Sequence, residues 1–271
     1  MIELLAPAFV ACLLLACILS YFGLHVLLRE VIFVDLALAQ LAALGAAVGH
    51  LLSAHADSFA TYLYSFGFTL AGAAIFALAR PAKTRLPQEA LIGIVYGVSA
   101  ALVILLVSKS ALDRDEVESM LTGRLLFAEW GEVGAMALLF GGVALLHFAL
   151  RRQFLEISEQ SRTHGSPTRR QKLLDFVFYA SFGVVVTSSV QLSGVLVVFG
   201  LLIVPASCAA IFFSSISNRL LASWLIGTIS CGAGIAASAL WDLPTGAAVV
   251  AALGVAFTLA VIGSIFPKAP G

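Results

Sequence analysis

Charged side chains are scarce in this sequence. Of its 271 residues, only 11% are Asp, Glu, Lys or Arg, whereas a soluble domain carries roughly 25%. So few charges cannot cover the surface of a water-soluble globule of this size. The sequence therefore excludes a soluble enzyme, and its net charge of zero gives no sign of a nucleic acid or another polyanion as a partner.

Motifs for catalysis are also missing. The sequence contains no HExxH, GxSxG or Ser-His-Asp arrangement and no Walker A pattern, so we predict neither an enzyme nor ATP hydrolysis by the Walker A route. The four cysteines lie in apolar runs without CxxC spacing, which favours small buried side chains over a thiolate metal site. The first residues include no basic stretch, so residues 4–28 are expected to be a retained span rather than a cleaved signal peptide.

Long apolar runs are what the sequence has instead. Hydrophobic residues make up 61% of the chain, the mean hydropathy is +1.05, and apolar runs of about 20 residues, the length of one transmembrane helix, recur throughout. Because backbone in lipid must satisfy its own hydrogen bonds, such runs favour helices over barrel strands. We predict one all-α transmembrane domain, residues 1–271, a polytopic helical bundle of nine spans, or eight if one helix is broken or re-entrant. The candidate spans are 4–28, 31–54, 58–79, 88–108, 132–150, 172–190, 192–213, 219–240 and 246–266.

Small residues recur at helical spacing within these spans. Gly45 and Gly49 form one pair, and Gly93 and Gly97 form another. Glycines spaced by four residues lie on one side of a helix and let a neighbouring backbone approach closely. We therefore expect both pairs to mediate helix packing.

The basic residues indicate the orientation of the spans. Cytoplasmic loops of membrane proteins are enriched in Lys and Arg. With nine spans, twelve of the 15 basic residues fall on the side that carries the C-terminus and loops 29–31, 80–87, 151–171 and 214–219. We therefore predict a multi-pass protein of the cell (inner) membrane, with its N-terminus outside and its C-terminus cytoplasmic.

Two loops are long enough to have functions of their own. The external loop, residues 109–131, carries five acidic residues. It is either a solvated face or a surface that receives a basic partner or concentrates cations. The cytoplasmic loop, residues 151–171, places Phe154, Leu155 and Ile157 among charged residues. This pattern predicts a short amphipathic helix that docks on a partner or lies on the membrane lipid.

One carboxylate lies inside an apolar run. Asp35 is about one helical turn into the second predicted span, where a lone carboxylate needs a cation, a hydrogen-bond donor or water. Two interpretations are open: an ion pair with Arg29, near the same helix end, or an oxygen ligand and charge relay for a passing cation. Gln40 lies roughly 140° around the helix from Asp35, so it is more readily a hydrogen-bonding partner of a neighbouring helix than a second ligand.

Other polar residues near span ends have simpler explanations. His25, His50 and His147 are expected to be interfacial histidines, with metal binding as the second reading. Asp175 and Asp242 lie at predicted helix ends, where capping or a favourable charge at the helix terminus is the default explanation.

Four stretches of the chain form an ordered set of motifs over nearly its whole length. They are residues 23–29 with Phe33, Asp35 and Gly45; residues 93–100 with 121–126; residues 194–209, which end in Leu-Leu-Ile-Val-Pro-Ala-Ser-Cys-Ala; and residues 242–246, Asp-Leu-Pro-Thr-Gly. Together they resemble the membrane permease subunits of the ABC importers for zinc, manganese and iron. The resemblance implies transport of a divalent transition-metal ion, zinc or manganese rather than iron, by alternating access, with no cofactor bound by this chain.

The resemblance also implies partners. A separate cytoplasmic ABC ATPase would use ATP, and an extracytoplasmic metal-binding protein would deliver the ion. A second permease subunit, in a homodimer or in a heterodimer, would complete the pathway. The external loop falls where a binding protein could dock. Residues 154–165 fall where the family has its coupling helix. Coupling to the ATPase is therefore expected at Phe154, Leu155, Ile157, Glu159 and Arg162.

The chain departs from the family pattern at one position. Family members usually carry a His four residues after the second-span Asp, whereas here that residue is Ala39 and Gln40 follows. Three interpretations are open: Asp35 acts with other ligands such as His25, Gln40 takes the place through a local bulge, or the cargo differs. We predict metal contacts at Asp35, Gln40 and His25.

A secondary metal transporter driven by protons or sodium is the alternative function. It would need charge relays deep in several helices, or paired broken helices in two halves of the chain. Only Asp35 is clearly embedded in a span. A membrane scaffold or sensor without cargo is a third possibility, which an embedded carboxylate disfavours.

Overall fold

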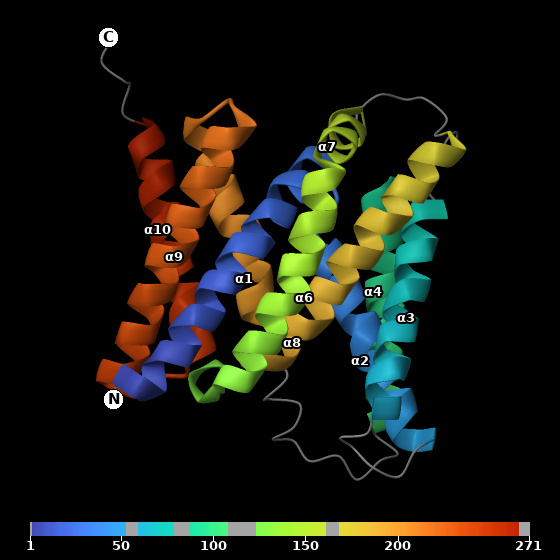
Figure 1. Ribbon diagram of the computed structural model, residues 1–271, viewed down its shortest axis with the longest axis horizontal. Coiled ribbons are helices and arrows are strands. Elements are labelled where there is room, and N and C mark those ends of the chain that lie inside the picture. The colour runs from blue at the N-terminus through green and yellow to red at the C-terminus, as the bar shows by residue number, and fades with distance from the viewer. Residues whose placement is uncertain (1, 53–58, 79–86, 108–122, 161–167, 266–271) are drawn as a thin grey trace. The chain divides into compact units, whose positions relative to one another are not determined.

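The computed structural model describes residues 2–52, 59–78, 87–107, 123–160 and 168–265. These residues form α-helices joined by turns, with one short 3-10 helix and no strand among them (Figure 1). The predicted all-α fold is confirmed. The elements are α1 (Ile2–Arg29), α2 (Val34–Leu52), α3 (Phe59–Leu78), α4 (Gln88–Val107), η1 (Leu125–Phe127), α6 (Trp130–Ala149), α7 (Arg151–Gln160), α8 (Arg169–Phe212), α9 (Ile216–Trp241) and α10 (Thr245–Ile265).

Most of these helices are membrane-spanning in length and composition. Within the described residues, seven helices are long and apolar enough to cross a bilayer, in agreement with a polytopic helical membrane protein. The helix α2 has a shorter apolar segment, Val34–Gly49. The helix α8 has 44 residues, about twice the length that one bilayer crossing requires. The total of nine spans, or eight, stays a prediction.

The long helix α8 is interrupted at Gly194. The backbone there has φ 76° and ψ 161°, a conformation that glycine adopts and side-chain-bearing residues avoid. The interruption leaves helical segments 169–193 and 195–212. They correspond to the two spans predicted at 172–190 and 192–213, with the break three residues later than the sequence indicated.

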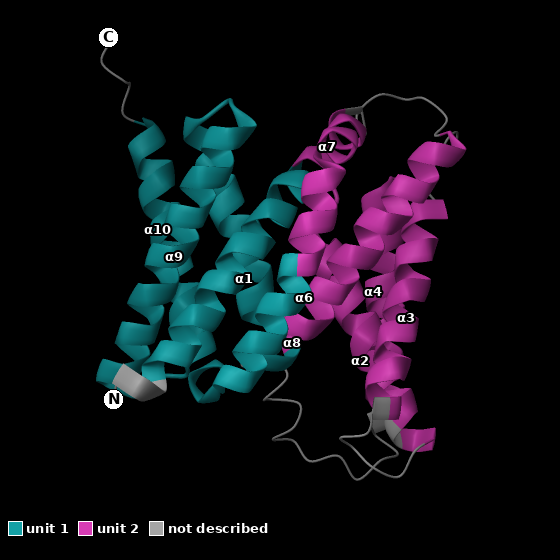
Figure 2. Ribbon diagram, in the orientation of Figure 1, with its two compact units in different colours: residues 1–27, 119–141, 191–271 teal, residues 28–118, 142–190 magenta. Residues whose placement is uncertain are grey.

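The chain forms two compact units, each assembled from segments that are distant in sequence (Figure 2). Unit 1 contains residues 1–27, 119–141 and 191–271, and unit 2 contains residues 28–118 and 142–190. In unit 1 the first turns of α1 and the last turns of α10 lie at opposite ends (Figure 1).

The helices of unit 1 approach each other closely at glycines. A Cβ atom added at Gly23 would lie 1.9 Å from the carbonyl oxygen of Leu202. One added at Gly234 would lie 2.5 Å from Cα of Val249. Distances this short show that α1 contacts the second half of α8, and α9 contacts α10, backbone against backbone. Glycine at these positions is therefore required by packing.

The turn between α9 and α10 explains the Asp-Leu-Pro-Thr-Gly stretch. Asp242 ends α9 in the left-handed conformation, with φ 52°, and its amide donates to the carbonyl oxygen of Ser238. The hydroxyl of Ser238 donates to the Leu243 carbonyl oxygen at 2.7 Å and also lies 2.7 Å from the Thr245 hydroxyl. The predicted position of Asp242 at a helix end is confirmed.

The segment that follows the external loop packs on the break in α8. The amide of Arg124 donates to the Leu192 carbonyl oxygen at 2.9 Å. Gly123 has φ 70°, and a Cβ atom added there would lie 2.2 Å from the carbonyl carbon of Ser193. Two of the family-like stretches, 121–126 and 194–209, therefore meet at this point in unit 1. Residues 109–122 of the external loop lie outside the described residues, so its proposed role stays a prediction.

Replacing Gly123 by alanine is expected to destabilise the protein by at least about 2 kcal/mol. The left-handed conformation costs a side-chain-bearing residue roughly 1–2 kcal/mol, and the new Cβ would also have to displace the backbone of Ser193. Thermal unfolding of the purified protein in detergent measures the effect. Gly131→Ala is the matched control, because a Cβ there meets nothing within 4 Å. Equal unfolding temperatures for the two variants would contradict the argument.

In unit 2, glycines hold α2 against α3. A Cβ atom added at Gly45 would lie 2.5 Å from the Tyr64 carbonyl oxygen, and one added at Gly49 would lie 2.9 Å from Cα of Thr61. The predicted packing role of this pair is confirmed. The prediction for Gly93 and Gly97 is wrong for contacts among the described residues, because added Cβ atoms there would meet nothing within 4 Å.

Candidate functional site

Asp35 is a buried carboxylate with one unsatisfied oxygen. It lies in the first turn of α2 and is 1% exposed. Its Oδ1 is buried and has no hydrogen-bond partner among the described residues. A buried carboxylate oxygen without a partner is costly in free energy. Such an oxygen is a candidate ligand for a cation.

Arg29 pairs with a different acid from the one suggested by the sequence. Its Nη1 lies 2.8 Å from Oδ1 of Asp175, and the two side chains are only 2% and 1% exposed. The Arg29–Asp35 ion pair is therefore wrong, and so is the view of Asp175 as a capping residue. The physical reason is the fold of unit 2, which brings α8 beside the end of α1 and offers Arg29 a buried carboxylate across 146 residues of sequence.

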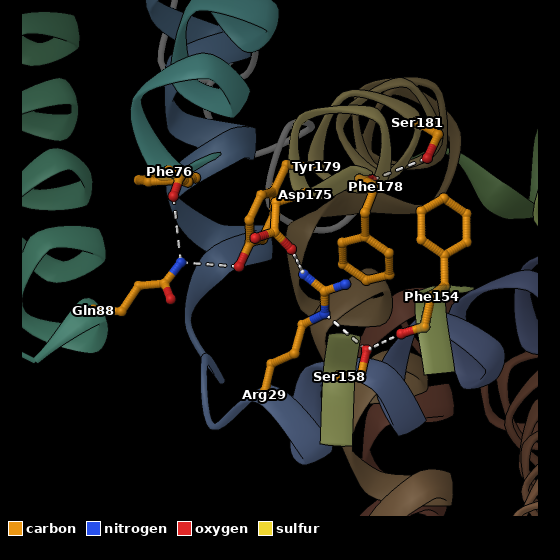
Figure 3. Close-up of polar contacts among 9 residues, drawn as sticks. All are labelled: Arg29, Phe76, Gln88, Phe154, Ser158, Asp175, Phe178, Tyr179 and Ser181. Carbon is orange, nitrogen blue, oxygen red and sulfur yellow. Dashed lines mark hydrogen bonds and ion pairs between the residues drawn. The ribbon is translucent and has the colours of Figure 1, made fainter. Parts of the chain in front are cut away.

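The Arg29 side chain also binds α7. Its Nε donates to the Ser158 hydroxyl at 2.9 Å, and that hydroxyl donates to the Phe154 carbonyl oxygen at 2.8 Å. The guanidinium carbon lies 3.9 Å from the centroid of the Phe178 ring, within the range of a cation–π contact. One buried arginine thus connects the end of α1 with α7 and α8 (Figure 3).

The helix α7 is amphipathic, as predicted. Phe154 and Ile157 are buried, Leu155 is half-buried, and Glu156 and Glu159 are exposed. The apolar face therefore packs on the rest of the chain, and the acidic face points away from it. Of the residues predicted to couple to an ATPase, the two buried ones hold α7 in place, whereas Leu155 and Glu159 remain accessible. Arg162 lies outside the described residues.

The two histidines whose side chains are described, His25 and His147, are buried and contact other side chains. The Nε2 atom of His147 lies 2.7 Å from the Ser181 hydroxyl, and its ring stacks on Phe154 with centroids 4.5 Å apart. His25 is buried and its ring lies 4.8 Å from that of Tyr21. His25 belongs to unit 1 and Asp35 to unit 2, so neither unit by itself brings them together. The side chain of His50 lies outside the described residues.

Gln40 does not replace the missing histidine through a bulge. The helix α2 is regular from Val34 to Leu52, so Gln40 keeps the angular offset of roughly 140° from Asp35 that five residues impose. The bulge interpretation is therefore wrong. Among the described residues, no cluster of three or more His, Cys, Asp or Glu side chains forms a ready-made metal site. The predicted metal contact of Gln40 stays a prediction.

Glu89 is the acidic neighbour of Asp35 that sequence reasoning missed. It lies in the first turn of α4, which packs on α2. Its Oε1 accepts from the amide of Phe33 at 3.2 Å, and its Oε2 is buried without a hydrogen-bond partner among the described residues. An acid in a first helical turn is ordinary. One sequence feature could have suggested that the two acids are neighbours: the predicted spans that contain Asp35 and Glu89 both begin on the predicted cytoplasmic side.

A hydrogen bond next to Glu89 connects α4 with the surroundings of Arg29. The Nε2 atom of Gln88 donates to the Tyr179 hydroxyl at 2.9 Å, and the Tyr179 ring centroid is 5.6 Å from the guanidinium carbon of Arg29. Figure 3 shows these side chains arranged from Gln88 through Tyr179 and Asp175 to Arg29 and Ser158. The acids of α2 and α4 and the anchor of α7 therefore occur at the same end of unit 2.

Comparison with known proteins identifies the family. The sequence profile of the ABC 3 transport family matches residues 1–264. The chain belongs to the ABC 3 transport family. This result confirms the family predicted from the four sequence stretches.

Individual relatives are distant but cover most of the chain. The chain is 24% identical over 259 residues to the uncharacterized membrane protein slr2045 of Synechocystis, with 96% of this chain and 90% of the relative covered. It is 27% identical over 207 residues to the manganese transport system membrane protein MntB of Synechocystis, with 76% of this chain and 66% of the relative covered. Its fold is similar to PsaBC from Streptococcus pneumoniae in complex with Fab, with a TM-score of 0.76 at 18% identity, covering 95% of this chain and 90% of that chain.

The stretches by which the ABC 3 family was recognised serve mainly to form the fold. Gly23 lies against Leu202, Gly123 lies against the break at Gly194, and Asp242 begins the turn into α10. These contacts explain why glycines and a turn motif dominate the resemblance. Two residues of the first stretch, Arg29 and Asp35, are buried charged side chains rather than packing positions.

Proposed function

We propose that this chain is the membrane permease of an ATP-driven importer for a divalent transition-metal ion, with Mn²⁺ or Zn²⁺ as the transported substrate. Asp35 carries this proposal, because it is 1% exposed and its Oδ1 is buried without a hydrogen-bond partner among the described residues. A carboxylate is a hard oxygen ligand, and its charge lowers the barrier to a dication in a low-dielectric region. Membership of the ABC 3 family and the manganese-transport relative support a metal ion as the substrate.

The ATPase would dock at α7 on the cytoplasmic side. The exposed Glu156 and Glu159 point away from the chain, and a hollow lies beside α7 and the start of α8. It is lined by Gln153, Glu156, Ile157, Thr168, Arg170, Gln171 and Leu174. Polar and charged side chains around a hollow suit a protein partner that binds reversibly. An extracytoplasmic metal-binding protein would dock on the opposite side, where the predicted orientation places the N-terminus.

Alternating access would begin with displacement of α7. Because Arg29 binds Ser158 on α7 and Asp175 on α8, a push on α7 is transmitted to α1 and α8 rather than absorbed by a loose surface helix. Two permease copies, expected to be identical, would then rock around the ion pathway. In this mechanism the permease provides the pathway, and the ATPase supplies the energy.

Transport by the reconstituted complex tests the proposal. The permease is combined in proteoliposomes with its ATPase and its metal-binding protein, and uptake of Mn²⁺, Zn²⁺ and Fe²⁺ is followed with and without ATP. We expect ATP-dependent uptake of Mn²⁺ or Zn²⁺. Uptake that persists with an inactive ATPase and stops when the proton or sodium gradient is removed would instead establish the secondary transporter.

Reversing the charge of Glu159 is expected to weaken ATPase binding roughly tenfold. The side chain is exposed on the outward face of α7, and a like-charge contact across an interface costs enough free energy for an effect of about this size. Co-purification of the ATPase with Glu159→Arg, and ATP-dependent uptake, are the measurements. Glu129→Arg is the control for co-purification only, because Glu129 is exposed and outside α7, in the loop predicted to be external. If both variants bind the ATPase like the wild type, Glu159 has no part in docking.

A further inference from the structure

We infer that the junction of α6 and α7 binds an anionic phospholipid, whose phosphate is held by Arg151 and Arg152 and whose acyl chains lie along the exposed end of α6. The whole site lies within unit 2, which includes residues 142–190. It is independent of the ion that the permease transports, and it gives α7 a contact with the membrane in addition to the proposed contact with the ATPase.

The last two turns of α6 present an apolar surface. Leu145 is 72% exposed and Phe148 is 65% exposed, and Ala144 and Ala149 beside them are exposed too. The helix α6 is long and apolar enough to cross a bilayer. An exposed apolar surface on such a helix is suited to contact with the hydrocarbon chains of lipids. The end of α6 therefore provides the apolar half of a lipid site.

Two arginines follow this apolar surface directly. Arg151 and Arg152 begin α7, and both residues are exposed. Neither forms an ion pair with an acid in the described part of the chain. The orientation predicted from the basic residues places them where α6 leaves the membrane on the cytoplasmic side. Positive side chains at this level meet the negatively charged headgroups of the cytoplasmic leaflet.

Contacts with Phe148 hold Arg151 at this boundary. Its Nη1 donates to the Phe148 carbonyl oxygen at 3.4 Å, and its guanidinium carbon lies 4.3 Å from the centroid of the Phe148 ring, within the range of a cation–π contact. Stacking occupies the face of a guanidinium, whereas a phosphate binds the N–H groups along its edge. Because a guanidinium has five N–H donors and the carbonyl accepts one, Arg151 is held in place and can still bind a phosphate.

Further basic residues at the start of α8 add to the positive charge at this end of unit 2. They are Arg169, Arg170 and Lys172. Arg170 lines the hollow that also contains residues of α7, so the start of α8 lies beside α7. Together with the two arginines of α7, these residues place five basic side chains next to two span ends. Clusters of this size beside a transmembrane helix are typical of segments that bind anionic lipid.

The charges of α7 are divided along its length, which distinguishes a lipid from the ATPase as the partner of the arginines. Arg151 and Arg152 lie at its start, whereas Glu156 and Glu159 are exposed further along the helix. The proposed ATPase contact is the acidic part, and Arg151 turns back onto α6 instead. The arginines therefore fit a phosphate at the membrane surface. A zwitterionic headgroup carries a compensating positive charge, so an anionic lipid such as phosphatidylglycerol is preferred.

Native mass spectrometry of the full-length permease in detergent tests the inference. The protein is titrated with dioleoyl phosphatidylglycerol or dioleoyl phosphatidylcholine, and the dissociation constant of the first bound lipid is measured. The variants are Arg151→Gln, Arg151→Lys, and Arg151→Gln combined with Arg152→Gln. The matched control is Arg124→Gln, because Arg124 is exposed but already paired with Glu132. Thermal unfolding of each variant verifies the fold. The ATPase is absent from this measurement, so its outcome does not depend on the proposed transport function.

We expect the wild type to prefer phosphatidylglycerol, and Arg151→Gln to weaken its binding about fivefold, the effect of one basic side chain near an anionic surface. The double variant should lose about tenfold or more, Arg151→Lys should retain most of the affinity, and Arg124→Gln should bind like the wild type. Wild-type affinity for phosphatidylglycerol in the folded double variant overturns the inference, and loss of ATPase co-purification by that variant would then assign the arginines to the ATPase contact. An equal loss in Arg124→Gln would also overturn it, because the effect would then not be specific to the junction of α6 and α7.

Discussion

Asp35→Ala is expected to reduce ATP-dependent metal uptake by at least about a hundredfold. At a separation of about 4 Å and an effective dielectric constant near 20, one charge pair is worth about 4 kcal/mol, and 1.4 kcal/mol corresponds to a factor of ten. A dication gains more than a single charge does. Because Asp35 is buried and ends in an unsatisfied oxygen, removing it deprives the ion of a charge that solvent cannot replace.

Two further variants separate the charge from the shape of the side chain. Asp35→Asn preserves the volume and one oxygen, so we expect it to lose most of the uptake. Asp35→Glu preserves the charge and is expected to retain part of it. Asp242→Asn, which removes an exposed acid at the end of α9 and puts a residue that tolerates the left-handed conformation there, should transport normally. Initial rates of Mn²⁺ and Zn²⁺ uptake in proteoliposomes are the measurement. Wild-type rates for Asp35→Ala would remove Asp35 from the transport mechanism.

Breaking the Arg29–Asp175 ion pair is expected to destabilise the protein by roughly 3–5 kcal/mol. Both side chains are almost fully buried, so either Arg29→Met or Asp175→Leu leaves one buried charge without its partner. Removing one partner of a buried ion pair is strongly destabilising. The double substitution removes both charges and is expected to regain most of the lost stability. The measurement is a double-mutant cycle: the unfolding temperatures in detergent of the wild type, the two single variants and the double variant.

Transport by the double variant then tests whether Arg29 couples α7 to the bundle. Arg29→Met with Asp175→Leu lacks the 2.9 Å hydrogen bond to Ser158, so we expect a stable permease whose uptake remains at least about tenfold below that of the wild type while the bound ATPase still hydrolyses ATP. Ser158→Ala should share the uncoupling with little loss of stability. A double variant that is stable and transports normally would limit Arg29 to a structural role.

The sequence determined the class of protein and most of its helices. A charge content of 11% with long apolar runs permits few alternatives to helices in a membrane, because unpaired backbone groups are intolerable in lipid. The amphipathic helix α7 and the turn at Asp242 could likewise be predicted, since both depend on local patterns. The glycine contacts were predictable only in part, because whether Gly93 faces a neighbour depends on which helices are adjacent.

Tertiary structure decided which polar residues meet. Arg29 and Asp175 are 146 positions apart, and Glu89 reaches the amide of Phe33 across 56 positions. No repeating pattern in the sequence predicts either contact. Each acid by itself resembles an ordinary residue of a first or second helical turn. By itself, then, the sequence determined that this chain is a helical membrane permease with an embedded acid at Asp35. Only the packing of α4 on α2 brought Glu89 to the amide of Phe33, and only the position of α8 gave Arg29 its partner Asp175. Buried charges are paired by proximity in space and not by separation along the chain.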